Sequence, residues 1–161
     1  MHSITVRPAL AAAALALSSL STLCAAQDAT PVQPRDMPAE IVAPATAGKE
    51  RAIFAVSDAD PQKWNLTLGN IGNAIDGIGK GNADIELVVY GPGIVMLKKD
   101  SAVADKLAAA IASGVRVVAC QNSMRGAHIE AADLAPGVHP VPSGVVELIR
   151  REHAGYAYVR S

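Results

Sequence analysis

Beyond residue 50, short runs of apolar residues alternate with stretches in which apolar residues recur every three or four positions. Near-continuous apolar runs are typical of strands that are covered on both faces in a parallel sheet. The wider spacing is typical of helices that bury one face. The pattern predicts strands at residues 52–56, 85–90, 115–120, 138–141 and 156–159.

The same pattern predicts helical structure in each interval between these strands. The first helix begins after the N-cap Asp60, because an aspartate followed by proline is a helix-start signal. One face of it is apolar and is expected to be buried: Trp64, Leu68, Ile71, Ile75 and Ile78. Further helices are predicted at 101–112 and 143–153, and the last should turn Val145, Leu148 and Ile149 inward. Residues 122–132 form either one short helix or two half-turns.

Alternating strands and helices predict an α/β fold with a mainly parallel sheet and right-handed crossovers. In such sheets, ligands bind outside the carboxyl ends of the strands, where the chain turns into the next helix. Three loops occupy these positions, at residues 57–60, 90–93 and 120–123. They are therefore the places where binding or chemistry is expected.

The first 26 residues have the charge order and cleavage-site chemistry of a secretory signal peptide. Arg7 precedes an apolar stretch from Ala9 to Leu23, and residues 24–26 place small side chains before a cut at Gln27. The stretch is shorter than the ~20 apolar residues of a spanning helix, so no stable membrane anchor is expected. A lipoprotein acylated at residue 24 is disfavoured, because the bulky Leu23 precedes it. The sequence therefore predicts a periplasmic or secreted protein.

Residues 27–49 are rich in proline and alanine and lack apolar periodicity, which is typical of an extended linker. Residues 50–161 are predicted to form one domain. The chain is 50% hydrophobic, which excludes general disorder. Its formal net charge of −1 disfavours nucleic acid as a partner, because phosphate contacts need a clustered excess of Lys and Arg.

The two cysteines, Cys24 and Cys120, are too few for a disulfide-stapled miniprotein or a four-cysteine zinc site. His128, His139 and His153 lack metal-ligand spacing, so neither a metal nor another cofactor is expected. If Cys24 leaves with the signal peptide, Cys120 is the one thiol of a mature protein in an oxidising compartment. Such a thiol is buried and inert, paired between chains, or reactive.

Cys120 stands where a predicted strand ends and a helix begins near Asn122. The positive end of a helix favours thiolate over thiol. Together with Arg125 and the N–H groups near Asn122 and Ser123, it would stabilise an anionic sulfur that carries a persulfide. Alternatively, Cys120 simply ends a core strand, since cysteine is among the most buried residue types. Both interpretations stay open.

The other two loops give weaker candidates for binding. Asp58 is one, whereas Asp60 is explained by helix capping. Gly91 and Gly93 flank Pro92 in a turn that is predicted to shape one wall of the crevice. The segment lacks the glycine series and the lysine of phosphate-binding loops.

Several segments, in their order along the chain, resemble the DsrE/DsrF-like family over about residues 50–160. They are Ile53–Asp58, Trp64-Asn65 with Asn70, Glu86–Gly93, Val118–Gly126 and Val141–Leu148, followed by the aromatic last strand. The resemblance implies a three-layer α/β sandwich around a mainly parallel five-stranded sheet. It also implies homo-oligomers or related hetero-oligomers. Cys120, followed by Arg125-Gly126, resembles the cysteine that accepts sulfur as a persulfide in this family.

The resulting hypothesis is an exported DsrE-like protein that carries sulfur on Cys120 or reacts there with small thiols. Its partners would be a second copy and a sulfur donor or acceptor, either a protein or a small sulfur compound. No general base is evident beside the thiol, which favours a carrier over a turnover enzyme. The apolar run Ile94–Leu97 is core or a subunit contact, and the family's oligomers favour the contact. The alternative is a non-catalytic module for small-ligand binding or assembly, in which Cys120 only packs.

Overall fold

Five parallel strands form one sheet in the computed structural model, which describes residues 48–160. The strands are β1 (Glu50–Val56), β2 (Ala83–Val89), β3 (Arg116–Cys120), β4 (Val138–Val141) and β5 (Ala157–Val159). They lie in the order β4-β3-β2-β1-β5, and each neighbouring pair is parallel. The predicted five-stranded parallel sheet is confirmed. The predicted signal peptide and residues 27–47 of the predicted linker lie outside the described residues.

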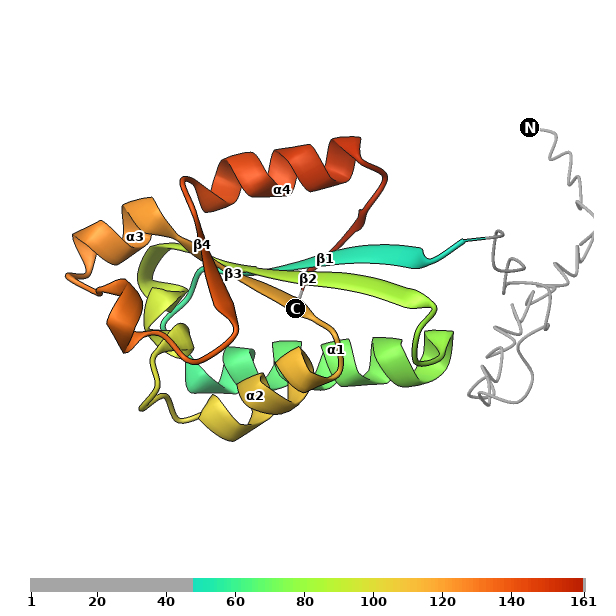
Figure 1. The fold of residues 1–161 in the computed structure, drawn as a ribbon, viewed down its shortest axis with the longest axis horizontal. Helices are drawn as coiled ribbons and strands as arrows, with labels where there is room; N and C mark the ends of the chain where they lie inside the picture. The colour runs from blue at the N-terminus through green and yellow to red at the C-terminus, as the bar shows by residue number, and fades with distance from the viewer. Residues whose placement is uncertain (1–47, 161) are drawn as a thin grey trace, which may run out of the picture. The chain divides into compact units, whose positions relative to one another are not determined.

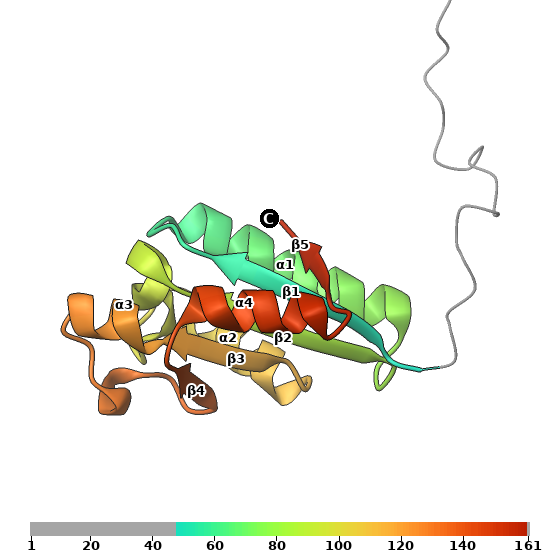
Figure 2. The same ribbon diagram turned by 90° about the horizontal axis from the view of Figure 1, so that it is seen from above.

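Helices cover both faces of the sheet (Figures 1 and 2). The helices α1 (Pro61–Ile78) and α2 (Ala104–Ala112) lie on one face, and α4 (Gly144–His153) lies on the other. Three short segments stand between strands: the 3₁₀ helices η3 (Gly91–Leu97) and η4 (Ala131–Asp133) and the helix α3 (Gln121–Gly126). The predicted three-layer α/β sandwich is therefore confirmed.

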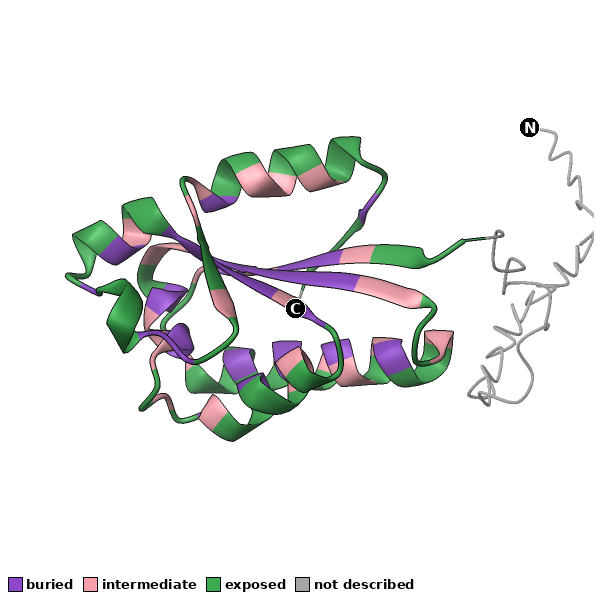
Figure 3. Ribbon diagram, viewed as in Figure 1, coloured by how far each residue is buried: buried purple, intermediate pink, exposed green. Residues whose placement is uncertain are grey.

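The main hydrophobic core lies between the sheet and α1 with α2, where the buried residues of α1 face the strands (Figure 3). Phe54, Leu87 and Val117, from the three central strands, are at most 1% exposed. Of the α1 residues predicted to be inward, Ile78 is half-buried and the others are buried: Trp64, Leu68, Ile71 and Ile75. The Gln62 N–H donates to Asp60 Oδ1 at 2.9 Å, so the predicted N-cap is confirmed as well.

The apolar run Ile94–Leu97 belongs to this core, which corrects the expectation of a subunit contact. Three of its four side chains are at most 1% exposed. The turn predicted at Gly91–Gly93 is the first part of η3, which carries the run inward. Close packing fixes this path, because a Cβ on Gly93 would stand only 3.0 Å from Val56 Cγ1 at the end of β1.

One predicted helix boundary differs from the structure, since the second helix begins at Ala104 instead of residue 101. Of the two alternatives for residues 122–132, the structure has two separate short segments, because α3 ends at Gly126 and η4 follows. His128 lies between them with φ of 54°, a left-handed conformation that an α-helix cannot continue through.

The helix α4 turns a different stripe toward the sheet from the one predicted. Val145 and Ile149 are 51% and 48% exposed, and of the three residues predicted to be inward only Leu148 packs on the sheet. Gly144, Glu147, Leu148 and Arg151 are the buried or half-buried residues that form the inner stripe. Three of these four residues have no apolar side chain to bury.

The cause of this rotation lies in the sheet. Glu86 on β2 faces α4 and is 0% exposed, so its carboxylate needs cationic partners, and Arg151 of α4 supplies one beside Arg116 of β3. Losing one partner of a buried ion pair costs about 3–5 kcal/mol. Leaving Val145 and Ile149 half exposed costs about 2–3 kcal/mol in total. Pairing the buried carboxylate therefore decides which side of α4 faces inward.

Candidate functional site

Cys120 is the last residue of β3, and the chain enters α3 directly after it. The strand end and the following helix thus lie where the sequence predicts them. The Cys120 residue is 4% exposed and pairs with Val141 of the edge strand β4. The sulfur therefore lies at the carboxyl edge of the sheet, just below the surface.

Several polar groups near Cys120 favour its ionised form. They are the Ser123 hydroxyl and the backbone N–H groups of Gly144, Ser123 and Asn122, whose hydrogen bonding lowers the pKa of the thiol. Burial raises the pKa of the thiol, since it disfavours the charged form, but these hydrogen bonds favour the thiolate. Together they outweigh the effect of burial and hold the pKa of Cys120 below its ordinary value of 9.0. The site therefore favours a nucleophilic thiolate more than a free cysteine does.

Gly144 brings the first N–H of α4 to the sulfur and is a site residue that the sequence analysis missed. A Cβ at this position would stand 3.1 Å from Tyr90 Cβ and 3.2 Å from both Cys120 Cβ and Val88 Cγ1. Only glycine lets the backbone approach so closely. The available signal was a glycine at the start of a helix that follows a strand, but that pattern alone does not name the residue it touches.

The loop after β2 orients Ser123. The Gly91 N–H donates to Ser123 Oγ at 2.7 Å, and Gly91 has a left-handed φ of 56° that favours glycine. The Gly93 N–H donates to the carbonyl oxygen of Ser57, at the end of β1, at 2.8 Å. These contacts tie the ends of β1 and β3 together beside the sulfur. Roles in ligand binding for Gly91 and Gly93 stay predictions.

Arg125 lies in the last turn of α3, and its guanidinium donates to the side-chain oxygen of Asn122. Among residues 48–160, no hydrogen bond or ion pair joins Arg125 to Cys120. Its role as the cation that stabilises the sulfur therefore stays a prediction. The side chain instead lines an open hollow of about 450 Å³ together with Gln121 and His128. Asn122 contributes to the site through its backbone N–H.

Asp58 stands apart from this arrangement, at the end of β1. Its carboxylate pairs with Lys63 at 2.9 Å, and its carbonyl oxygen accepts a 2.7 Å hydrogen bond from Trp64 Nε1. Both contacts fasten the start of α1 to the strand. A role for Asp58 in ligand binding also stays a prediction, and no contact in the described part of the chain joins it to Cys120.

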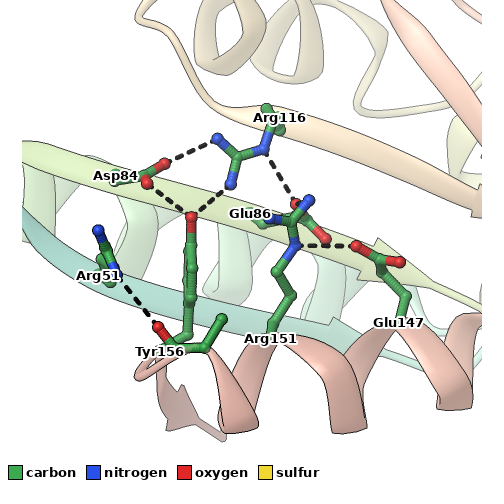
Figure 4. Close-up of polar contacts among 8 residues, drawn as sticks. Arg51, Asp84, Glu86, Arg116, Glu147, Arg151 and Tyr156 are labelled. Atoms are coloured by element: carbon green, nitrogen blue, oxygen red, sulfur yellow. Dashed lines mark hydrogen bonds and ion pairs between the residues drawn. The ribbon is translucent and has the colours of Figure 1, made fainter.

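A second polar group lies between α4 and the sheet, and the sequence analysis did not single it out (Figure 4). We call it the ionic cluster, and it consists of Asp84, Glu86, Arg116, Glu147, Arg151 and Tyr156. Arg116 donates to Asp84 Oδ1 at 2.8 Å and to the Tyr156 hydroxyl at 2.7 Å. That hydroxyl in turn donates to Asp84 Oδ2 at 2.6 Å. The signal in the sequence was a pair of acidic residues, Asp84 and Glu86, two positions apart in a strand that is otherwise apolar.

Glu86 is the buried centre of the ionic cluster. Its Oε2 accepts a hydrogen bond from Arg116 Nε at 3.0 Å and forms an ion pair with Arg151 Nη2 at 2.8 Å, whereas no described residue donates to its Oε1. Burial raises the pKa of Glu86, even though the Arg116 hydrogen bond and the Arg151 charge oppose this. For Asp84, burial is outweighed by the hydrogen bonds from Tyr156 and Arg116, so its pKa is lowered.

No three His, Cys, Asp or Glu side chains among residues 48–160 are grouped so that they could hold a metal ion. None of the helices in this part of the chain has the length and apolar character needed to cross a membrane.

The chain was compared with protein families, curated proteins and solved structures. Residues 50–160 match the model of the DsrE/DsrF-like family. No curated protein is significantly similar to the chain. A solved structure that resembles it is the protein of unknown function MTH1491 from Methanobacterium thermoautotrophicum, with 31% identity and a TM-score of 0.67. That match covers 70% of this chain and 100% of the relative.

Two further solved structures share the fold at lower identity. The ychN protein from E. coli is 17% identical with a TM-score of 0.57, and the match covers 70% of this chain and 99% of that one. BT1422 from Bacteroides thetaiotaomicron, a conserved protein of unknown function, is 15% identical with a TM-score of 0.58. There the match covers 70% of this chain and 95% of the other.

Proposed function

The chain belongs to the DsrE/DsrF-like family, and on that premise we propose that it carries sulfane sulfur as a persulfide on Cys120. The observation that carries the proposal is the close approach of Gly144 to Cys120, together with hydrogen bonding from the Ser123 hydroxyl and nearby backbone N–H groups, which lowers the pKa of the thiol. A core cysteine that only packs has no need of such donors, because a neutral thiol is a weak hydrogen-bonding group. A thiolate or a persulfide anion needs them.

The loading step requires a thiolate and a small sulfane-sulfur donor, for which thiosulfate is the model. The Cys120 thiolate attacks the outer sulfur of thiosulfate and forms a new S–S bond. The S–S bond of thiosulfate breaks, and sulfite leaves with the electron pair. The negative charge moves to the outer sulfur of the persulfide. No proton is transferred, so the step needs no general base.

Unloading follows the same chemistry in the opposite direction. A thiolate of the acceptor attacks the outer sulfur, and Cys120 leaves as a thiolate. Because the hydrogen bonds stabilise this leaving thiolate, they favour release as well as loading. The chain would thus pass sulfur between a donor and an acceptor without consuming a cofactor.

Burial limits which donors can react. Cys120 is 4% exposed, and the exposed residues Gln121 and Asn122 follow it at the surface. We expect small donors to react faster than bulky disulfides, because the latter cannot reach the sulfur without a local opening of α3 or α4.

Incubation with thiosulfate, followed by intact mass measurement, tests the proposal. The protein should gain ~32 Da, the mass of one sulfur, and a reductant should remove the gain. Cys120→Ser should show no gain, whereas Ser113→Ala, at the end of α2, should load as the unmodified protein does. If the mass does not change, or if the Cys120→Ser variant gains the same mass, the carrier function is wrong.

A second candidate function is assembly, in which this domain acts through its surface with a second copy. The apolar residues Val145, Val146 and Ile149 on α4 and Tyr158 on β5 are between 41% and 51% exposed. Apolar surface gathered on one helix is typical of a protein contact. The mass in solution tests this: Val145→Gln with Ile149→Gln should dissociate an oligomer, and Cys120→Ser should leave it intact. A monomer at all concentrations contradicts the assembly role.

The proposed place of action is the periplasm or the exterior of the cell, and it rests on the signal-peptide pattern of residues 1–26. Sequencing the N-terminus of the protein from its native compartment tests it. A chain that begins at Gln27 and is found outside the cytoplasm supports export. An uncut chain that remains in the cytoplasm contradicts it.

A further inference from the structure

The helix α4 is attached to the sheet by few apolar contacts. Gly144 is the one buried residue among the ten in this described helix. Leu148 is half-buried and packs with the small cluster of Ile53, Val88 and Val118 on this face of the sheet. Apolar packing is not directional, so a single half-buried leucine cannot fix the position of a helix along its axis. Other contacts must determine where the first residue of α4 stands.

Arg151 provides directional contacts in the last turn of α4. Its Nη2 stands 2.8 Å from Glu86 Oε2, and its Nε donates to Glu147 Oε1 at 2.8 Å (Figure 4). The guanidinium also lies 5.4 Å from the centre of the Tyr156 ring. Because Glu86 is 0% exposed, any slide of α4 that lengthens this ion pair leaves a buried carboxylate poorly matched. The pair therefore resists movement of the helix in each direction.

The other end of the same helix touches the thiol. Gly144 and Arg151 are seven residues apart, which places them two turns and about 10 Å from one another on one face of the helix. The backbone of so short a helix moves as a rigid unit, so a shift at Arg151 appears at Gly144. There, hydrogen bonding from the Gly144 N–H favours the thiolate form of Cys120. The backbone of Gly144 lies against Cys120, since a Cβ built on it would stand 3.2 Å from Cys120 Cβ.

We propose that Glu86 and Arg151 are positioning residues for Cys120, because their ion pair fixes α4 where the Gly144 N–H binds the sulfur. The proposal rests on the proposed function, because it concerns the same thiolate. Its test measures only the ionisation of the thiol, without any sulfur donor. The positioning role and the carrier function can therefore fail independently.

The test is a pH titration of Cys120 in the full chain, followed by thiolate absorbance in the ultraviolet with Cys120→Ser as the blank. The matched variants are Arg151→Met, Glu86→Met and Arg150→Met. Arg150 is the exposed neighbour of Arg151, so its replacement removes the same charge without breaking a contact of the ionic cluster. Thermal unfolding of each variant reports its stability separately, and stability alone does not move the titration of a thiol.

Loss of positioning and loss of charge have different signatures. If α4 loses its position, both Arg151→Met and Glu86→Met lower the ionisation constant of Cys120 about three- to tenfold, the effect of one lost hydrogen bond. If charge alone acts, Glu86→Met raises that constant, because a negative charge has been removed. Arg150→Met should leave the titration unchanged in the first case.

The proposal is overturned if Arg151→Met titrates as the unmodified protein does. It is also overturned if the Arg151→Met and Glu86→Met shifts have opposite signs, or if Arg150→Met shifts as far as Arg151→Met. If Glu86→Met does not fold, the comparison of Arg151→Met with Arg150→Met decides alone.

Arg151→Lys tests for rescue, since one ammonium can reach Glu86 but cannot also hold Glu147. The titration of Cys120 in this variant should lie between those of the unmodified protein and of Arg151→Met. Loading with thiosulfate is a separate measurement. If the unmodified protein fails to load, the carrier function is wrong, but the titration still tests the positioning role.

Discussion

The backbone N–H of Gly91 donates to Ser123 Oγ at 2.7 Å, so the hydroxyl oxygen of Ser123 acts as an acceptor for the loop after β2. A hydroxyl has one proton to donate. Since its oxygen accepts from Gly91, that proton is free for the Cys120 sulfur. The loop after β2 thus acts on the thiol at the end of β3 through a single serine.

Replacing this serine should weaken the thiolate. We expect Ser123→Ala to raise the pKa of Cys120 and to lower its ionisation constant about three- to tenfold, because one hydrogen bond to an anion is lost. The rate of alkylation by a small reagent, measured against pH, checks this. Ser113→Ala is the control, since its hydroxyl donates to Ala109 on α2. If the two variants show the same alkylation rates at every pH, Ser123 does not act on the thiol.

Adding one methyl group at Gly144 should disturb both the fold and the thiol. The new Cβ would meet Tyr90 Cβ at 3.1 Å and Cys120 Cβ at 3.2 Å, so we expect Gly144→Ala to push α4 outward. Overpacking of this kind costs about 1–3 kcal/mol of unfolding free energy. Denaturant unfolding measures the loss, and a higher pKa of Cys120 should accompany it.

Gly72→Ala is the matched control for that change. It also adds a methyl group to a helical glycine, but nothing lies within 4 Å of the new Cβ. In the interior of α1, alanine should stabilise the fold by about 0.5–1 kcal/mol. If both glycine variants change stability in the same direction, the close packing at Gly144 is not what limits the site.

The lowered pKa of Cys120 should make stability depend on pH. Between the pKa in the folded chain and the ordinary value of 9.0, the unfolded chain binds more protons than the folded one. Unfolding free energy therefore rises with pH through this window, and the gain is lost as the pH falls through the folded pKa. Cys120→Ala lacks this titration, so the advantage of the unmodified protein over the variant should grow with pH up to about 9. Denaturation under reducing conditions at several pH values measures the difference. A difference that is the same at every pH contradicts a lowered pKa.

Removing Arg116 should destabilise the fold through the ionic cluster. Its guanidinium serves Asp84, Glu86 and Tyr156 at once, and its loss leaves the buried Glu86 with Arg151 alone as its cation. We expect Arg116→Met to cost about 3 kcal/mol, the lower end for a broken buried pair, because Arg116 is 40% exposed. Arg150→Met, at an exposed position, should change stability by less than about 0.5 kcal/mol. Similar losses in the two variants would show that the ionic cluster contributes little.

The pattern of the sequence predicted the fold well because its strongest signals are local. The run that became β4 has the same bounds in the prediction and in the structure, and Asp60 caps α1 as expected. Apolar periodicity in α1 likewise identified the residues that meet the sheet. The ends of the short helices were less accurate, since a single residue such as His128 decides where a turn stops.

The candidate site was predicted only in part, because its contacts join residues that are distant in the chain. Cys120, Asn122 and Ser123 lie together in sequence, so a local pattern could single them out, whereas Gly144 comes from another element. The inner side of α4 was predicted wrongly for the same reason. Its apolar residues favour one orientation, and the buried Glu86 on β2 imposes another, which no window of residues within α4 can reveal.

The order of the chain gives the Gly144 contact a consequence for biogenesis. Cys120 emerges during synthesis before Gly144, so the nascent protein holds a cysteine that still lacks one of its donors. The thiol gains its full acidity only when α4 has docked on the sheet. In a polypeptide cut short before that helix, the pKa of Cys120 would lie closer to the value of an ordinary cysteine. The face of the sheet that α4 covers would also be exposed.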